Sequence, residues 1–289
     1  MKTNSSFRDY SVWIFKIIML GLFCSCSSSI DRFDKIVSIE DFDLKGKVKS
    51  LKETTNLTQE KFGEYQKTKF ISQHIELFNR DGNEDKSFKI GQDGQELRKI
   101  LIYYDHNGYP KEVITYVNDT VFEKLVYNYD VNKRKLERSV FQPDGSLTRR
   151  FINIFNEEGN DILENYYNSD GNLESKCGQE YDKKGNRISL VSYKPDGRLS
   201  VRRTYFYNKN NLVTEENEYN ENSKSETTYS KYNDKGNLVE KANTSGRSMH
   251  DYLKYDKEGN WLVKIVKWFN SNYPKPADVY IIERDITYY

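Results

Sequence analysis

Cysteine, proline and long apolar runs are scarce in this chain of 289 residues, and each scarcity excludes a class of protein. The chain has 3 cysteines and 5 prolines, so neither a disulfide-rich scaffold nor a proline-rich extended chain is expected. Apolar residues, tyrosine included, make up only 36% of the chain against 31% charged residues, which argues against a thick aliphatic core. The formal net charge is +1, whereas nucleic-acid-binding proteins present a basic excess, so no nucleic-acid partner is expected.

Aromatic residues are plentiful instead. They make up 14% of the chain, and 23 of them are tyrosines. A chain with almost no net charge and this many aromatic side chains can bury enough apolar surface to fold, so disorder is not expected.

Residues 1–26 have the features of an export signal. The apolar run over residues 17–23 is too short to span the hydrocarbon layer of a membrane, so it is typical of a signal segment and not of a transmembrane helix. Three basic residues precede this run, Lys2, Arg8 and Lys16. The chain is therefore predicted to be exported.

The end of this segment carries a candidate lipidation site. Residues 23–29 read FCSCSSS and resemble the lipobox of bacterial lipoproteins, in which a small residue precedes an acylated cysteine. Cys26, preceded by Ser25, fits that pattern better than Cys24, although Phe23 stands where the family usually has leucine. The resemblance implies cleavage after Ser25, a lipid on Cys26 and attachment to the outer membrane, facing the periplasm or the surface. The alternative is an ordinary secretory signal with incidental cysteines.

After a polar tether over residues 27–39, residues 40–289 are predicted to form one repeat domain. Successive glycines in its centre are 14, 12, 14 and 12 residues apart, so one unit is 26 residues long and contains two turns. The same step reaches Arg134 and Asn211, where the glycine has been lost. The glycines interpreted as structural turn residues are Gly82, Gly108, Gly145, Gly159, Gly171, Gly185, Gly197, Gly236 and Gly259.

The two turn types predict hairpins with defined backbone geometry. In the first type, exemplified by YDKKGN at residues 181–186, the aspartate can accept a hydrogen bond from the backbone two residues on, and glycine takes the left-handed position after a type I turn. The second type has Pro-Asp-Gly, as at residues 143–145 and 195–197. Both patterns favour short hairpin loops with a bulge at the glycine, which should have a positive φ.

The segments between turns alternate with a period of two. Leu125, Tyr127 and Tyr129, for example, share one face of the segment that contains them, which is typical of β-strands. Short loops between consecutive strands predict an all-β antiparallel meander. Open twisted sheets rarely exceed about ten strands, so the sheet is expected to curl into a spiral or a partly closed sheet. The tyrosine rings are expected to pack across strands while their hydroxyls stay in water.

These turn units resemble the YD repeats of the RHS family, which occur in large bacterial surface and toxin proteins and in animal teneurins. The resemblance covers about residues 70–265, and both ends of the domain resemble small YD-repeat lipoproteins of Gram-negative bacteria. One departure is that asparagine follows the glycine, as in Asn186 and Asn260, where large members usually have arginine. Likeness of fold does not transfer an activity.

No catalytic or metal-binding pattern is found. His74, His106 and His250 are far apart, so no metal site and no cofactor are expected. Residues 81–85 begin like a calcium loop, but Lys86 replaces the required glycine, which favours a hairpin. Carboxylate runs are interpreted as solvated strand faces; the clearest is Glu215, Glu216 and Glu218. Cys177 is interpreted as a small strand residue, because the sequence indicates no cleft that would activate its thiol.

The sequence thus favours a lipid-anchored, non-enzymatic envelope protein that presents an extended binding surface. A glycan and a protein are equally open as the ligand. The alternative is an accessory or shell-like component of a toxin or secretion system, since large YD-repeat proteins build hollow shells. A glycosidase-like enzyme is the least favoured hypothesis, because no carboxylate pair stands out from the many that the chain contains.

Overall fold

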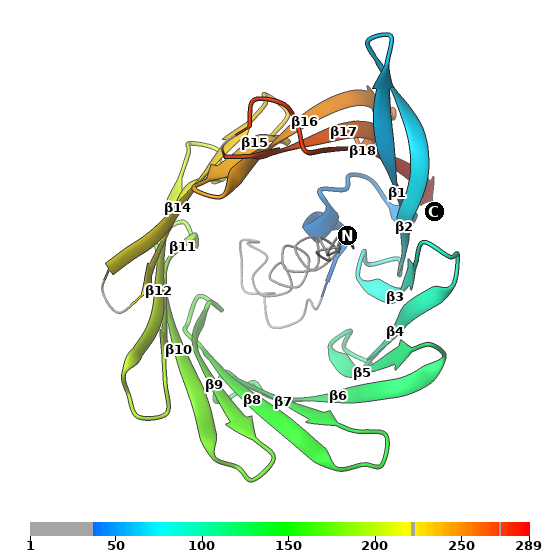
Figure 1. Ribbon diagram of the computed structural model, residues 1–289. Helices are drawn as coiled ribbons and strands as arrows, with labels where there is room; N and C mark the ends of the chain where they lie inside the picture. Colours follow the sequence, from blue (N-terminus) through cyan, green and yellow to red (C-terminus); the bar gives the residue numbers. More distant parts are fainter. Residues whose placement is uncertain (1–36, 221–222, 272) are drawn as a thin grey trace, which may run out of the picture.

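The computed structural model describes residues 37–220, 223–271 and 273–289. The predicted export segment, including Cys26, lies outside the described residues. The described chain forms one antiparallel sheet of 18 strands in which each strand pairs with the next (Figure 1). The strands are β1 (Val48–Lys61), β2 (Glu64–Phe78), β3 (Glu84–Ile90), β4 (Glu96–Tyr104), β5 (Pro110–Val117), β6 (Thr120–Asp130), β7 (Lys135–Phe141), β8 (Leu147–Phe155), β9 (Asp161–Asn168), β10 (Leu173–Tyr181), β11 (Arg187–Tyr193), β12 (Leu199–Tyr207), β13 (Val213–Asn220), β14 (Ser223–Tyr232), β15 (Leu238–Asn243), β16 (Gly246–Tyr255), β17 (Trp261–Asn270) and β18 (Asp278–Tyr288).

The sheet closes into a barrel. β1 pairs with β2 on one side and with β18 on the other, in a register that runs from Val48 opposite Tyr288 to Leu57 opposite Tyr280. The prediction of a meander was right, but the prediction of a spiral or partly closed sheet was wrong. Closure satisfies the backbone groups that two open edge strands would leave exposed. The pairing joins segments at opposite ends of the described chain, so no local sequence pattern predicts it.

A short 3-10 helix, η2 (Ile39–Phe42), lies within the ring of strands (Figure 1). Around it sits the main apolar cluster, whose fully buried members are Leu44, Val48, Leu51 and Phe78. Phe42 packs edge-on against Phe78, with ring centroids 5.6 Å apart. The last residues of the predicted tether belong to the same contact, because Ile39 donates its backbone N–H to the Gly82 carbonyl at 3.0 Å.

The turns have the predicted chemistry. Asp182 Oδ1 accepts hydrogen bonds from the backbone N–H groups of Lys184 and Asn186, at 2.8 and 2.9 Å. Gly185 follows with φ +81°. The predicted turn glycines all have φ between +77° and +86°, a region that costs glycine nothing. Arg134 and Asn211, which stand where the repeat has lost its glycine, keep the left-handed conformation at φ +47° and +60°.

Several tyrosines that stand directly before a turn tie their strand to the strand before it. Tyr104, Tyr181 and Tyr207 donate their hydroxyls to backbone carbonyls at the start of the preceding strand, at 2.6 to 2.9 Å. The acceptor lies 20 residues earlier in each case. The expectation that these hydroxyls stay in water was therefore wrong. The half-buried ring can reach a carbonyl, and a bonded hydroxyl avoids the penalty of burying a polar group alone.

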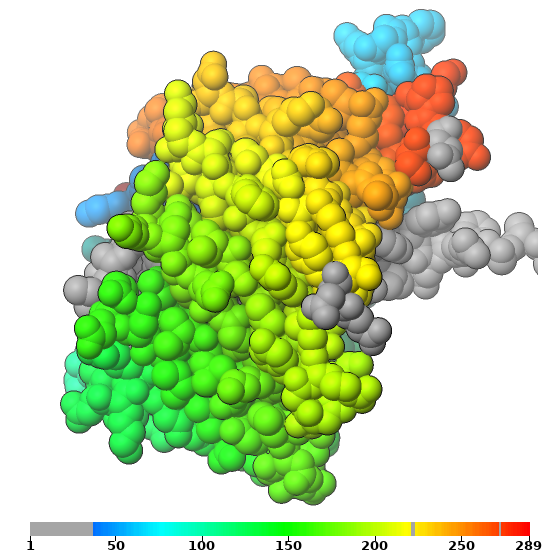
Figure 2. All heavy atoms as spheres, turned by 90° about the vertical axis from the view of Figure 1, so that its left-hand side faces the viewer, coloured from blue at the N-terminus to red at the C-terminus, as the bar shows by residue number. Residues whose placement is uncertain are grey.

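The outer wall is charged and aromatic. Ion pairs join neighbouring strands there, such as Lys124 Nζ to Glu112 at 2.7 Å. Cations also lie over the rings of their direct cross-strand partners, as Arg150 does over Tyr167 at 5.2 Å from the ring centroid. Figure 2 shows this wall as a continuous surface on the side of β9 to β15, with the β1–β2 hairpin projecting beyond it. No helix in the described part of the chain has the length and apolar character that crossing a bilayer would need.

Candidate binding site on the inner wall

The inward face of the sheet can be traced from η2. The Phe42 carbonyl accepts a hydrogen bond from Arg284 Nη1 at 3.2 Å, and the Phe42 ring meets Phe78, so Arg284 and Phe78 both point into the barrel. Direct cross-strand partners in an antiparallel sheet share a face. The register continues this face through Ile102, Val113 and the strands that follow to β10.

A hollow of about 410 Å³ opens on this inner face across β8, β9 and β10. Its lining residues are Arg149, Phe151, Glu164, Tyr166 and Ser175. Phe151 and Tyr166 are direct cross-strand partners whose rings stack, with centroids 5.1 Å apart and planes 26° apart. Ser175 is the next partner in the same row. This hollow therefore places aromatic rings beside charged groups on the inner wall.

The charged groups beside the rings are paired with one another. Arg138 donates to Glu164 Oε2 at 2.6 Å and to Asn153 Oδ1 at 3.0 Å, and its guanidinium lies over the Phe151 ring at 5.0 Å. Arg149 donates to Glu123 Oε2 at 2.7 Å. These pairs hold the rings in place and leave the hollow without a strong net charge.

A second carboxyl group lies behind this network. Asn153 donates its amide to Asp161 Oδ2 at 2.7 Å and to Glu164 Oε2 at 3.2 Å. Burial raises the pKa of Asp161 to about 6, while Asn153 opposes the shift by hydrogen bonding. Two carboxyl groups in unlike environments are the pattern of acid–base catalysts. Asp161 does not line the hollow, however, so it is not positioned to meet a ligand there.

Buried charges also surround η2. Arg284 and Lys264 lie over the Trp261 ring, at 3.6 and 4.1 Å from its centroid. Burial by itself would raise the pKa of Glu53, but Lys264 and Arg284 outweigh it and hold that pKa below its ordinary value. Burial lowers the pKa of Lys264. These groups balance one another and fasten η2 to the seam, so they are structural.

Two glutamates face each other beside the same helix. Glu76 and Glu84 are 8% and 5% exposed. Burial, together with their mutual repulsion, raises the pKa of Glu76 well above its ordinary value, and burial does the same to Glu84. The pair therefore holds a proton at neutral pH, which makes the seam sensitive to alkali.

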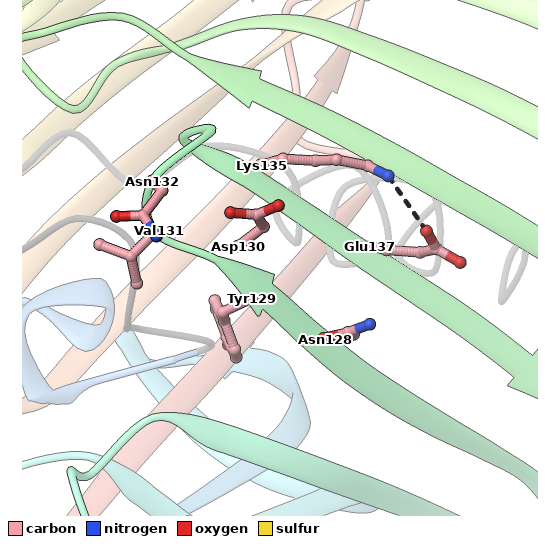
Figure 3. Close-up of a pocket in the computed structure, with 7 residues that line it drawn as sticks. All are labelled: Asn128, Tyr129, Asp130, Val131, Asn132, Lys135 and Glu137. Atoms are coloured by element: carbon pink, nitrogen blue, oxygen red, sulfur yellow. Dashed lines mark hydrogen bonds and ion pairs between the residues drawn. The ribbon is translucent and has the colours of Figure 1, made fainter.

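A hollow of about 450 Å³ lies on the outside, at the β6–β7 turn (Figure 3). Its polar lining includes Asn128, Asp130 and Lys135, and Lys135 Nζ pairs with Glu137 at 3.3 Å. Tyr129 borders it, but the Tyr129 ring stacks with the inward-facing Tyr127, at 6.3 Å between centroids. The hollow thus offers few apolar contacts to a ligand.

The residues singled out from the sequence do not gather into a site. His106 lies in the β4–β5 turn, His74 faces Glu53 on the inner wall, and His250 accepts or donates a hydrogen bond with Ser248 at 3.0 Å. Burial lowers the pKa of His250 to about 4. No group of three metal-ligating side chains occurs within the described ranges.

The remaining candidates are explained by the sheet. Residues 81–85 form the β2–β3 turn and the start of β3, with Asn79 accepting from the Asp81 and Asn83 backbone. Glu216 and Glu218 both pair with Arg203, at 3.6 and 2.8 Å, so the glutamate run is less solvated than expected. Cys177 lies half-buried on the inward face of β10.

Sequence reasoning did not single out the residues of the inner hollow. A usable signal was present: once Gly159 fixes the β8–β9 turn, counting outward from it pairs Phe151 with Tyr166. What the count cannot supply is which face of the strands points inward.

No protein-family model matches the chain, and no curated protein does. Among solved structures, it is similar to a porin-like protein from Bacteroides uniformis, with 9% identity and a TM-score of 0.47, over 84% of this chain and 98% of that one. It is also similar to a TcdB2-TccC3 complex, with 12% identity and a TM-score of 0.24, over 78% of this chain but only 16% of that one. A protein of unknown function from Bacteroides fragilis matches 58% of this chain, with 13% identity and a TM-score of 0.15. With likenesses this distant, the function has to come from the residues of this chain.

Proposed function

We propose that this protein is an exported, lipid-anchored and non-enzymatic binding protein of the cell envelope, built from YD-type repeats. The observation that carries the proposal is the inner-wall hollow, where stacked aromatic rings stand beside hydrogen-bonding groups in a closed barrel. Ligand sites typically combine apolar and aromatic walls with a few oriented polar groups. A glycan or a protein segment would both suit such a wall.

The export segment supports the envelope location, and the outer wall supports a lipid as the means of attachment. Charged pairs such as Lys124 with Glu112 stand on the outward face of the strands. A barrel inserted in a bilayer needs an outward apolar band instead. An acylated Cys26 would let the barrel stand in water beside the membrane, because two or more acyl chains anchor a protein stably.

Absence of turnover is part of the proposal. The carboxyl pair beside the hollow, Asp161 and Glu164, shares Asn153 as a hydrogen-bond donor, and Asp161 does not line the hollow. A glycosidase would need both carboxyl groups to reach the same glycosidic bond.

A shell-like role in a toxin or secretion system is the second candidate, and closure of the sheet favours it. η2 within the ring argues against it, because the helix occupies part of the interior that a cargo would need (Figure 1).

The test of the proposed function is fractionation of the full chain expressed in a Gram-negative host. Wild-type protein should remain with membranes through a high-salt wash, and mass spectrometry should find a diacylated Cys26 at the mature N-terminus. The Cys26→Ser variant should be released or remain an unprocessed precursor. An unmodified Cys26 in membrane-free protein would contradict the anchor, and turnover of a polysaccharide or peptide library would contradict the non-enzymatic assignment.

A further inference from the structure

We propose that the inner-wall hollow across β8, β9 and β10 is a subsite for a neutral saccharide, with a sugar ring packed on the Tyr166 side chain. The proposal rests on the binding function proposed above and names the class of its ligand. Four observations carry it: an open aromatic face, spare hydrogen-bonding capacity, balanced charge and size.

The first observation is a row of side chains that leaves one ring face open. Arg138, Phe151, Tyr166 and Ser175 are successive cross-strand partners on β7 to β10. Phe151 lies between the Arg138 guanidinium, 5.0 Å from its centroid, and the Tyr166 ring, 5.1 Å away. Tyr166 has the small Ser175 as its other neighbour, so the hollow opens beside its ring. The C–H groups of a pyranose ring can pack on that electron-rich face.

The second observation is unused hydrogen-bonding capacity around the ring. Glu164 accepts two bonds on Oε2, from Arg138 and Asn153, whereas a carboxylate offers about four acceptor sites. Arg149 donates to Glu123 through Nη2 and carries further N–H groups in its fork. Sugar hydroxyls both donate and accept, so a mixed set of carboxylate and guanidinium edges suits them.

The third observation is the charge of the hollow. Arg138 pairs with Glu164 and Arg149 pairs with Glu123, at 2.6 and 2.7 Å. Two cations facing two carboxylates leave no surplus positive charge for a phosphate, a sulfate or a uronic acid. An anionic ligand would also meet Glu164 at the edge of the ring. The balance therefore favours an uncharged ligand.

The fourth observation is size. The hollow has a volume of about 410 Å³, inside the range of roughly 300–1,000 Å³ in which small-molecule sites fall. A monosaccharide or disaccharide segment of a longer chain fits that range. A folded protein surface would not enter it.

The test uses the purified full chain in detergent and a panel of neutral hexasaccharides, namely malto-, cello-, manno- and xylohexaose, with hexagalacturonate as the acidic probe. Binding is measured by calorimetry and by saturation-transfer NMR. At least one neutral probe should bind, and hexagalacturonate should bind more weakly. Tyr166→Ala should weaken binding about tenfold, as expected for loss of one aromatic packing contact, and Tyr166→Phe should retain it.

The matched control is Tyr167→Ala. Tyr167 is the neighbour of Tyr166 on the same strand but faces outward, under Arg150, so its loss should leave saccharide affinity unchanged. Equal denaturation midpoints for Tyr166→Ala and Tyr167→Ala would show that an affinity difference is not a folding defect. If Tyr166→Ala proves less stable than its control, Ser175→Tyr serves as the second variant, because it fills the hollow without removing the ring and should abolish binding.

Three results would overturn this inference: no neutral probe binds, hexagalacturonate binds best, or Tyr166→Ala and Ser175→Tyr bind like the wild type. In each case a lipid on Cys26 would leave the envelope proposal standing. Hydrolysis of a probe, or an unmodified Cys26, would instead contradict the proposed function, so the two failures are distinguishable.

Discussion

The seam of the barrel and its repeated wall are stabilised in different ways. At the seam, formed by η2, β1, β2, β17 and β18, fully buried apolar side chains meet across the chain termini, as Leu51 does with Phe78. In the repeated wall from β6 to β15, most side chains are only half-buried, and tyrosine hydroxyls, asparagine amides and ion pairs join each hairpin to its neighbour. Short-range hydrogen bonds can thus build a wall one unit at a time, whereas closing it needs a core.

Asparagines at corresponding positions of the turns make different hydrogen bonds in the wall and at the seam. Asn186 donates its amide to Asp182 and to Asn211, within the repeats. Asn260, at the corresponding place in the turn after β16, accepts from the Lys45 backbone N–H at 2.7 Å and donates to the Lys45 carbonyl at 3.0 Å. In the wall, a turn asparagine therefore joins one turn to the next. At the seam, the same residue type joins the segment before β1 to the turn before β17.

The largest expected effect comes from removing a core side chain at the seam. Phe78 is 2% exposed, so Phe78→Ala should lower the free energy of unfolding by about 3–5 kcal/mol. Phe206, on the wall, is 53% exposed, and Phe206→Ala should change it by no more than about 0.5 kcal/mol. Urea denaturation measures both. Equal losses at the two sites would contradict the assignment of the core to the seam.

The next effect concerns pH. Because the folded-state pKa of Glu76 is raised, the folded protein holds a proton that the unfolded chain has released. Stability from this group is complete below the ordinary glutamate pKa and is lost as the pH rises through the raised one. Wild-type stability should fall between about pH 5 and about pH 9, by more than about 1.4 kcal/mol, the equivalent of one pKa unit.

Glu76→Gln should remove the part of that slope that comes from Glu76, since the amide cannot ionise, while Glu84, whose pKa burial also raises, keeps its own part. Glu180→Gln is the control, because Glu180 lies exposed on β10 and should leave the slope unchanged. A wild-type stability that is flat across this range would show that the pair at the seam ionises without cost.

A smaller effect is expected from the tyrosine bonds of the wall. Tyr207→Phe removes the hydroxyl that donates to the Arg187 carbonyl at 2.6 Å and should cost about 1 kcal/mol. Tyr103, 48% exposed on the outer wall, provides the control, since Tyr103→Phe should be nearly neutral. A neutral Tyr207→Phe would mean that water replaces the bond, and the wall would then depend on its strand pairing alone.

Effects no larger than these are expected at the turns. Gly145 has φ +84° and Gly178 has an ordinary φ, and a Cβ at either would meet no atom within 4 Å. Gly145→Ala should therefore cost about 1 kcal/mol through backbone strain alone, while Gly178→Ala should be neutral or stabilising. Arg134→Gly should stabilise the protein, because Arg134 already has a positive φ. Thermal unfolding compares the three variants. If Gly145→Ala leaves the stability unchanged, the turn does not need glycine for its positive φ.

Much of the wall could be predicted because its determinants lie within a few residues of each other. The Asp-x-x-Gly pattern specifies both the turn and the sign of φ at glycine, and a period of two between turns specifies strands. The roles of Tyr104 and Tyr181 were missed for a different reason. Their hydroxyls reach carbonyls 20 residues away, and that distance is set by how two neighbouring strands pair in the sheet.

The sequence by itself determined the local structure of this protein: the turns, the strands, their order and the antiparallel meander, since each depends on neighbours in the chain. Tertiary structure alone decided that β1 meets β18, that η2 lies within the ring, and that Phe151, Tyr166 and Ser175 face inward as one row. The physical reason is that strand alternation assigns side chains to two faces without saying which is inside. Only closure of the sheet, through contacts between the two ends of the chain, makes that choice.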